Sequence, residues 1–149
     1  MSASDAFESD ILKLIFNNTA IANLGDATGI VGSTSAGSIF VALHTADPLD
    51  SGTQSTNETT YTGYARQAVA RTFGAFTVTG LSPTQVANTA VITFPSSTAG
   101  TPTITHFSIG YQISGATKIV LSGALTTPQV INVGGVNTFA IGALVATCD

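Results

Sequence analysis

The segment from His44 to Glu58 gathers the residue types that could do acid–base chemistry in this chain. His44 and Asp47 stand close together ahead of Pro48, and Asp50 and Glu58 follow. A histidine oriented by a carboxylate can act as a general base, but the sequence contains no Gly-x-Ser-x-Gly nucleophile motif. A turn at a strand end, in which Asp47 accepts hydrogen bonds from backbone amides, accounts for the same residues. We favour the turn and expect no catalytic residues and no enzyme.

Metal binding could take two forms in this sequence. Zinc needs three or four His, Cys or carboxylate ligands, but the two histidines and Cys148 lie far apart along the chain. Calcium could use Asp47, Asp50 and Glu58 with backbone carbonyls, but the EF-hand pattern is absent. A solvated or partner-facing loop explains these carboxylates, so we expect neither a metal nor a cofactor.

Several other side chains indicate contact with a partner. Tyr61 and Tyr64 flank a turn, and tyrosines are enriched in interface cores, although packing over the end of a sheet suits them equally. Arg66 and Arg71 flank a predicted strand, where they could pair with carboxylates of a neighbouring subunit or lie solvated at the surface. The candidate partner-contact residues are Phe7, Ile11, Leu14, His44, Asp47, Asp50, Tyr61, Tyr64 and Arg66.

One substantial helix is expected over residues 2–17. Apolar residues recur at i, i+4, i+7 and i+8 from Phe7, which is the spacing of one helical face. Ser2 or Ser4 can cap the start of this helix, and the pair Asn17-Asn18 is suited to its end.

Short strands follow this helix and a Gly/Ser/Thr-rich loop at residues 25–37. Their regular Gly and Pro punctuation predicts an all-β, jelly-roll-like β-sandwich of about eight strands with an N-terminal helix. In the strand that contains His106, the alternation shifts midway, which indicates a bulge or burial on both faces. A long polar stretch at residues 44–62 is typical of a functional or mobile loop. We expect a single domain over residues 1–149, with the helix at 2–17 and the sandwich at 38–147. The expected strands are 38–44, 64–71, 75–79, 90–94, 103–111, 118–125, 129–133 and 138–147.

The composition is unusually poor in charge. Only 8% of the residues are charged while 44% are hydrophobic, against about 25% charged residues in an ordinary domain. A surface built from Thr, Ser, Asn, Gly and small apolar residues can be buried against another protein at little desolvation cost. Lys and Arg together number 4, too few to follow a phosphate backbone. We therefore expect a protein that works in an assembly and binds neither nucleic acid nor a membrane.

Three stretches of the chain have distinctive local sequences. They are residues 14–26 (LIFNNTAIANLGD), 37–48 (GSIFVALHTADP) and 57–66 (NETTYTGYAR). Together they resemble a family of small virion proteins of tailed bacteriophages, whose members are often labelled tail-fibre proteins. The resemblance implies a structural role and brings no catalytic residues with it. The nearest functional analogy is to capsid cement or decoration proteins, jelly rolls that clamp adjacent capsid subunits.

The resemblance and the composition together give the expected function. The protein is expected to cement or decorate the exterior of a phage capsid by binding between subunits of the major capsid protein, and to form a homodimer or homotrimer. The alternative is a tail component, such as a fibre, baseplate or adhesin module, and a carbohydrate-binding β-sandwich comes third. The protein is expected to be made in the bacterial cytoplasm without secretion. The helix at 2–17 and the loop at 44–62 are the expected contact elements.

Overall fold

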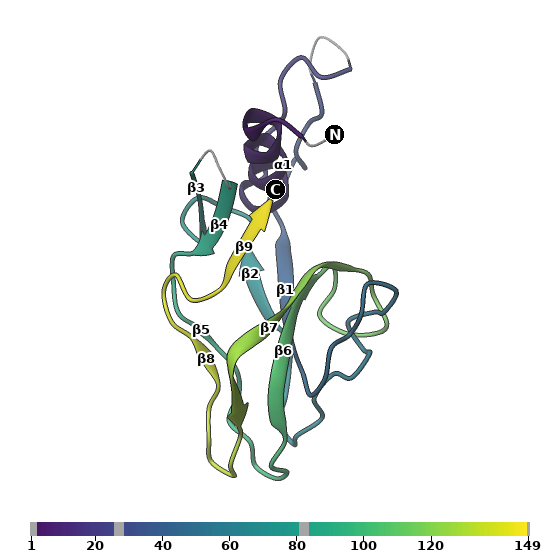
Figure 1. The fold of residues 1–149 in the computed structure, drawn as a ribbon, viewed down its shortest axis with the longest axis vertical. Helices are drawn as coiled ribbons and strands as arrows, with labels where there is room; N and C mark the ends of the chain where they lie inside the picture. The colour runs from purple at the N-terminus through teal and green to yellow at the C-terminus, as the bar shows by residue number, and fades with distance from the viewer. Residues whose placement is uncertain (1–2, 26–28, 81–83, 149) are drawn as a thin grey trace. The chain divides into compact units, whose positions relative to one another are not determined.

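The computed structural model describes residues 3–25, 29–80 and 84–148, which are mostly β-sheet with one N-terminal helix (Figure 1). The strands form antiparallel sheets of four, three and two strands, so the predicted all-β, sandwich-like class with an N-terminal helix is confirmed. The chain divides into two compact units: one holds residues 1–38, 70–91 and 139–149, and the other holds residues 39–69 and 92–138. No helix in the described ranges has the length and apolar character needed to cross a membrane.

The first unit is built from helix α1 (Asp5–Asn17) and a sheet in the order β3 (Phe76–Thr79), β4 (Thr84–Asn88) and β9 (Val145–Cys148). Helix α1 packs on β3 and β4. The rings of Phe16 and Phe76 meet edge to face with their centroids 5.0 Å apart, and both side chains are fully buried. These aromatic rings anchor the helix to the sheet.

Both ends of α1 are fixed by polar contacts. The Ser4 hydroxyl accepts a hydrogen bond from the backbone N–H of Phe7 at 3.4 Å, so Ser4 is the cap, while Ser2 lies outside the described residues. Asn18 ends the helix in the left-handed conformation, with φ 55°, which asparagine tolerates. Its side chain also exchanges two hydrogen bonds with the backbone of Ser33, which ties the following loop to the helix.

Arg71 provides the positive charge that the last turn of α1 lacks. Its guanidinium donates to the carbonyl oxygens of Leu14 and Ile15, both at 2.6 Å, and to that of Ala36 at 3.3 Å. Carbonyl groups at a helix C-terminus have no partner within the helix and carry a partial negative charge. Arg71 therefore binds the helix end within its own unit, which corrects the expectation that it is solvated or paired with a neighbour's carboxylate.

The apolar face predicted from Phe7 is not the face that packs inside the chain. Leu12 and Phe16 are the buried apolar residues, whereas Phe7 is 39% exposed. Ile11 and Leu14 are only half-buried. The second half of the helix is apolar at nearly every position, so its sequence allows two overlapping stripes, and packing against β3 and β4 selects the one that carries Phe16.

The second unit contains a four-stranded sheet in the order β2, β1, β6 and β7. Strands β1 and β6 pair in antiparallel register from Phe40 opposite Gly110 to His44 opposite His106. The register of β6 with β7 shifts between Ile104 and His106 and again next to Gly110, as a bulge requires. Ser108, Ile109 and Gly110 are all buried, so the end of the strand also fits the other predicted alternative, burial on both faces. The bounds are β1 (Ser38–His44), β2 (Gln67–Ala70), β6 (Thr103–Gly110) and β7 (Ile119–Val130); β5 (Ile92–Thr93) and β8 (Thr138–Phe139) form the separate pair.

Several predicted strand boundaries are wrong. The segments expected at 118–125 and 129–133 are joined in one strand, β7, but its pairing with β6 is interrupted between Ala124 and Gln129. The strand expected at 138–147 is two, β8 and β9, and β4 was not expected at all. Of the loop expected at 25–37, residues 26–28 lie outside the described ranges.

Candidate functional site

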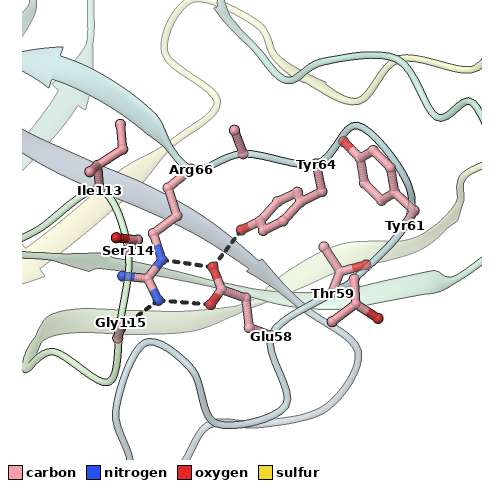
Figure 2. A pocket seen from close by; sticks show the side chains of 10 residues that line it. Glu58, Thr59, Tyr61, Tyr64, Arg66, Ile113, Ser114 and Gly115 are labelled. Carbon is pink, nitrogen blue, oxygen red and sulfur yellow. Dashed lines mark hydrogen bonds and ion pairs between the residues drawn. The ribbon is translucent and has the colours of Figure 1, made fainter.

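A pocket of about 540 Å³ opens in the second unit beside the long segment that follows β1 (Figure 2). Its wall combines a carboxylate, a guanidinium, two tyrosines and small polar residues. The lining residues are Glu58, Thr59, Thr60, Tyr61, Tyr64, Ala65, Arg66, Ile113, Ser114 and Gly115.

The centre of the pocket wall is a two-pronged ion pair between Arg66 and Glu58. Arg66 Nε donates to Glu58 Oε1 and Arg66 Nη2 donates to Glu58 Oε2, both at 2.7 Å. The side chains are 2% and 15% exposed, respectively. Tyr64 adds a third bond, because its hydroxyl donates to Glu58 Oε1 at 2.9 Å. Each charge is thereby neutralised inside the chain, and the pocket wall carries no net charge.

The remaining donors of Arg66 reach a second loop. Nη1 donates to the carbonyl of Gln112 at 3.1 Å, and Nη2 donates to that of Gly115 at 2.9 Å. Nη1 also approaches Gln54 Oε1 at 3.3 Å. Since its donors are occupied by the chain itself, the guanidinium joins the segment around Gln54 and Glu58 to the turn between β6 and β7.

Gln54 connects this ion pair to the sheet. Its Nε2 donates to the carbonyl of Phe40 at 2.9 Å, and its Oε1 accepts from the hydroxyl of Thr117 at 3.0 Å. A Cβ atom at Gly110 would lie 2.1 Å from Gln54 Cδ. Glycine is therefore required at position 110 so that the buried amide can lie directly against the backbone of β6.

His44 is a further buried polar group beside the site. Its Nδ1 lies 2.8 Å from the carbonyl of Thr56, and its Nε2 lies 2.8 Å from the hydroxyl of Ser108. A carbonyl can only accept, so Nδ1 carries the proton and Nε2 accepts from Ser108 in the neutral ring. Burial lowers the pKa of His44, more strongly than the bond to Thr56 raises it. The imidazole is thus held neutral.

This histidine–serine pair does not have the surroundings of a nucleophile and its base. His44 and Ser108 are both fully buried, so a substrate has no access to either. The group behind His44 Nδ1 is a carbonyl and not a carboxylate. In the structure, the pair joins β1, β6 and the segment around Thr56.

Tyr64 and Tyr61 pack as well as bond. The Tyr64 hydroxyl accepts from the backbone N–H of Leu43 at 3.0 Å, and burial raises the pKa of this phenol well above its ordinary value. The Tyr61 hydroxyl donates to the carbonyl of Pro95 at 2.8 Å. The two tyrosine rings meet edge to face at 5.4 Å, and Tyr64 stacks on Phe94. Both tyrosines therefore help to hold the interior of the unit together.

The predicted contact residues fall into two groups. His44, Tyr61, Tyr64 and Arg66 are brought together in or beside the pocket and bond within the chain. Phe7, Ile11, Leu14, Asp47 and Asp50 are exposed or half-buried. Contact with a partner stays a prediction for all nine.

The two aspartates after β1 lie apart from the ion pair. Asp47 Oδ1 accepts from the backbone N–H of Leu49 at 2.8 Å, which confirms the predicted strand-end turn. Asp50 lines a smaller hollow beside Ile119 and Leu121 of β7. Among residues 3–25, 29–80 and 84–148, no cluster of three or more His, Cys, Asp or Glu side chains could hold a metal ion.

Four residues that surround Arg66 and His44 in the structure were not identified from the sequence. Gln54, Ser108 and Thr117 are common polar residues in a chain rich in them, and nothing in their local sequence marks them. Gly110 does carry a signal, because a glycine inside a strong strand indicates a close approach by another group.

The comparisons with known proteins agree with a structural role. A family model described as podophage GP4 fiber I protein gp80 matches residues 2–147, and no curated protein matches the chain. The match confirms the expected phage virion family, and it supports the tail-component alternative better than capsid cementing. The chain belongs to this family of podophage fibre proteins and is a structural protein of the phage virion.

Proposed function

We propose that this chain is a structural subunit of a fibre on the tail of a podophage. The observation that carries the proposal is the family match, which extends over residues 2–147 and names a fibre protein. The cementing function rested on an analogy with capsid proteins, and nothing in the family description favours it. The fibre therefore replaces the capsid exterior as the proposed location.

The surface supports a role inside an assembly. Charged residues make up 8% of the chain, and large apolar side chains are well exposed in both units. Such side chains are normally covered when subunits pack, and few ions have to leave water when that happens. The most exposed are Val31 (67%), Ile141 (67%), Phe73 (64%), Val133 (63%), Leu49 (59%) and Val130 (59%).

The pocket supports a mechanical role for the second unit. Residues 45–66 contain neither helix nor strand, yet Arg66 and Gln54 bond to groups far along the chain. The ion pair is neutral and its donors are occupied within the chain. These bonds fix the conformation of the irregular segment 45–66. A fixed conformation suits a subunit that must present the same surface to its neighbours in every copy.

The proposed partners follow from the same surface. We propose that the chain associates with itself, as a homodimer or homotrimer, and with a neighbouring protein of the tail. Contact with the major capsid protein belongs to the cementing alternative. With Lys and Arg together numbering 4, the chain offers little to nucleic acid.

Copy number and position in the virion test the proposal. Quantitative mass spectrometry of purified particles should find the chain at a low copy number set by the symmetry of a tail. Gold-labelled antibodies should mark the tail in electron micrographs. A copy number comparable to that of the major capsid protein, with label over the shell, would restore cementing. Absence from purified particles would overturn both functions.

A further inference from the structure

The pocket beside the ion pair has the size of a ligand site and two walls that are tied to each other. Its volume of about 540 Å³ lies within the range of about 300–1,000 Å³ that is usual for small-molecule sites. Figure 2 shows Glu58 and Tyr64 towards one side of the view and Ile113 and Gly115 towards the other. Arg66 bonds to Glu58 and to Gly115. The hollow is therefore held in shape by the chain itself.

The charges of the pocket wall exclude an ionic ligand. The guanidinium of Arg66 is almost fully buried, and each of its nitrogens already donates to an oxygen within the chain. It is therefore not available to a phosphate or carboxylate group. The Glu58 carboxylate is paired with this guanidinium, so a cation gains little from it. The other lining residues are uncharged, and the pocket suits an uncharged ligand.

The same wall keeps hydrogen-bonding capacity that the folded chain does not use. The Glu58 carboxylate accepts three hydrogen bonds and is 15% exposed, while a carboxylate has about four acceptor sites. Thr60 and Ser114 are exposed residues of the lining, and each hydroxyl can both donate and accept. Among the residues that the structure describes, the buried Thr59 hydroxyl has no hydrogen-bond partner. These groups suit a ligand with several hydroxyls.

Apolar surface lies next to these polar groups. Ile113 lines the pocket and is 54% exposed, and the half-buried Tyr64 adds part of an aromatic ring. A wholly apolar ligand would cover the carboxylate and the hydroxyls without bonding to them, which is unfavourable. A sugar ring has C–H groups on its faces and hydroxyls around its edge. It can therefore satisfy both kinds of surface at once.

We propose that this pocket binds an uncharged hexose unit. Hydroxyls of the sugar bond to the Glu58 carboxylate and to the side chains of Thr60 and Ser114, and a C–H face of the ring packs on Ile113. The internal bonds of Arg66 already fix the wall, so binding has few side chains to order. Since few hydrogen bonds are available, we expect a dissociation constant on the order of 1 mM. This binding activity is additional to the fibre role and does not depend on it.

An NMR titration of the full chain tests the site. The probes are the methyl α-D-glycosides of glucose, galactose and mannose, added separately. With at least one of them, the amide signals of Thr60, Ser114 and Gly115 should shift and reach saturation, while those of α1 stay in place. Glucuronate should bind at least about tenfold more weakly, because its carboxylate finds no available cation in the pocket.

Filling the pocket with a large side chain distinguishes this site from weak binding elsewhere. Thr60→Trp places an indole at an exposed position of the lining and should weaken glycoside binding at least about tenfold. Thr62→Trp is the matched control, because Thr62 is an exposed threonine of the same segment that does not line the pocket. Binding by this control should be unchanged. Circular dichroism of each variant checks that the sheets are intact.

The outcomes separate the sugar site from the proposed function. A chain that shows no saturable shift with any of the glycosides up to about 100 mM overturns the site. So does binding that Thr60→Trp leaves unchanged, or glucuronate binding as tight as that of the neutral sugars. If Thr60→Trp prevents incorporation into particles while the purified chain binds no glycoside, the pocket takes a virion protein and the sugar site is wrong. The protein's position on the virion is measured independently, so loss of the sugar site leaves the fibre assignment standing.

Discussion

Each of the two units is organised by one arginine, and the two arginines work differently. In the second unit, Arg66 is almost fully buried and forms a bidentate pair with Glu58. In the first unit, Arg71 is half-buried and bonds to the backbone carbonyls of Leu14 and Ile15. The first arrangement depends on a matching opposite charge, and the second depends on the partial charges of a helix end.

The difference predicts which arginine of this low-charge chain can be substituted at the smaller cost to stability. A buried carboxylate whose partner is removed stays in a poor environment and strongly destabilises the fold. Backbone carbonyls at a helix end can turn to water when a side chain is removed. The same substitution at the two arginines should therefore have unequal effects.

Arg66→Met should have the largest effect. It leaves the Glu58 carboxylate buried without its partner and removes the bonds to Gln112 and Gly115. We expect a loss of about 3–5 kcal/mol in the free energy of unfolding, measured by urea denaturation. A loss below about 1 kcal/mol would mean that the ion pair contributes no more than an exposed surface pair.

A double variant separates the unpaired charge from the other lost contacts. Glu58→Gln removes the carboxylate's charge while keeping an oxygen that can accept from Tyr64. The Glu58→Gln/Arg66→Met variant should therefore cost about 1–3 kcal/mol less than the two single losses added together. Additive losses would show that the charges do not interact.

Arg71→Met should cost less, about 1–2 kcal/mol. It removes the cation at the end of α1 but leaves no carboxylate without an ionic partner, because Arg71 bonds to backbone carbonyls. Hydrogen exchange should quicken at the end of the helix, while the amides of β1 and β6 stay protected. Arg71→Lys, which keeps the charge, should recover part of the loss. If Arg71→Met and Arg66→Met lower the free energy of unfolding equally, the proposed difference between the two arginines is wrong.

His44 should add a smaller effect that depends on pH. Below the ordinary pKa of 6.5, the unfolded chain protonates this side chain, but burial lowers the pKa of His44 in the folded chain. The unfolded state then binds more protons, so the free energy of unfolding should fall as the pH drops below 6.5. Urea denaturation on both sides of that pH should show the fall. A His44→Asn variant that keeps the same pH dependence would assign it to another group.

The elements with strong local signals could be predicted from the sequence. β1 occupies the predicted residues 38–44, because alternating β-branched and aromatic residues lie there between Gly37 and a proline turn. Helix α1 was predicted from its apolar periodicity and its serine cap. β4 was missed because two of its inward residues are polar: Thr84 and Asn88 are buried, and they bond to backbone groups that the local sequence does not reveal.

Pro128 explains another boundary error. Proline removes one backbone donor, so the sequence predicted a break between two strands. Pro128 lies between Ala124 and Gln129, where the pairing of β7 with β6 is interrupted, so the missing donor costs no ladder hydrogen bond and the strand resumes at Gln129. Whether two segments pair with the same neighbouring strand is a property of the whole sheet and cannot be read from the segments themselves.

The site was predicted in its members but not in its arrangement. The sequence predicts contact with a partner for His44, Tyr61, Tyr64 and Arg66. In the structure, each of these side chains forms hydrogen bonds within the chain. Glu58 was considered only as a cation ligand. The ion pair depends on how residues 45–66 fold back on themselves, and polar loop sequences carry little information about such a path.

The anchoring of residues 45–66 has a consequence for how the chain can change. This stretch looks like the natural place for a protease cut or an inserted peptide, because it lacks helix and strand. Yet Gln54 and Arg66 fasten it to β1 and to the turn after β6. An insertion between these two anchors would alter their spacing and pull the guanidinium from its carboxylate. Epitope tags and new loops are therefore better placed outside this stretch.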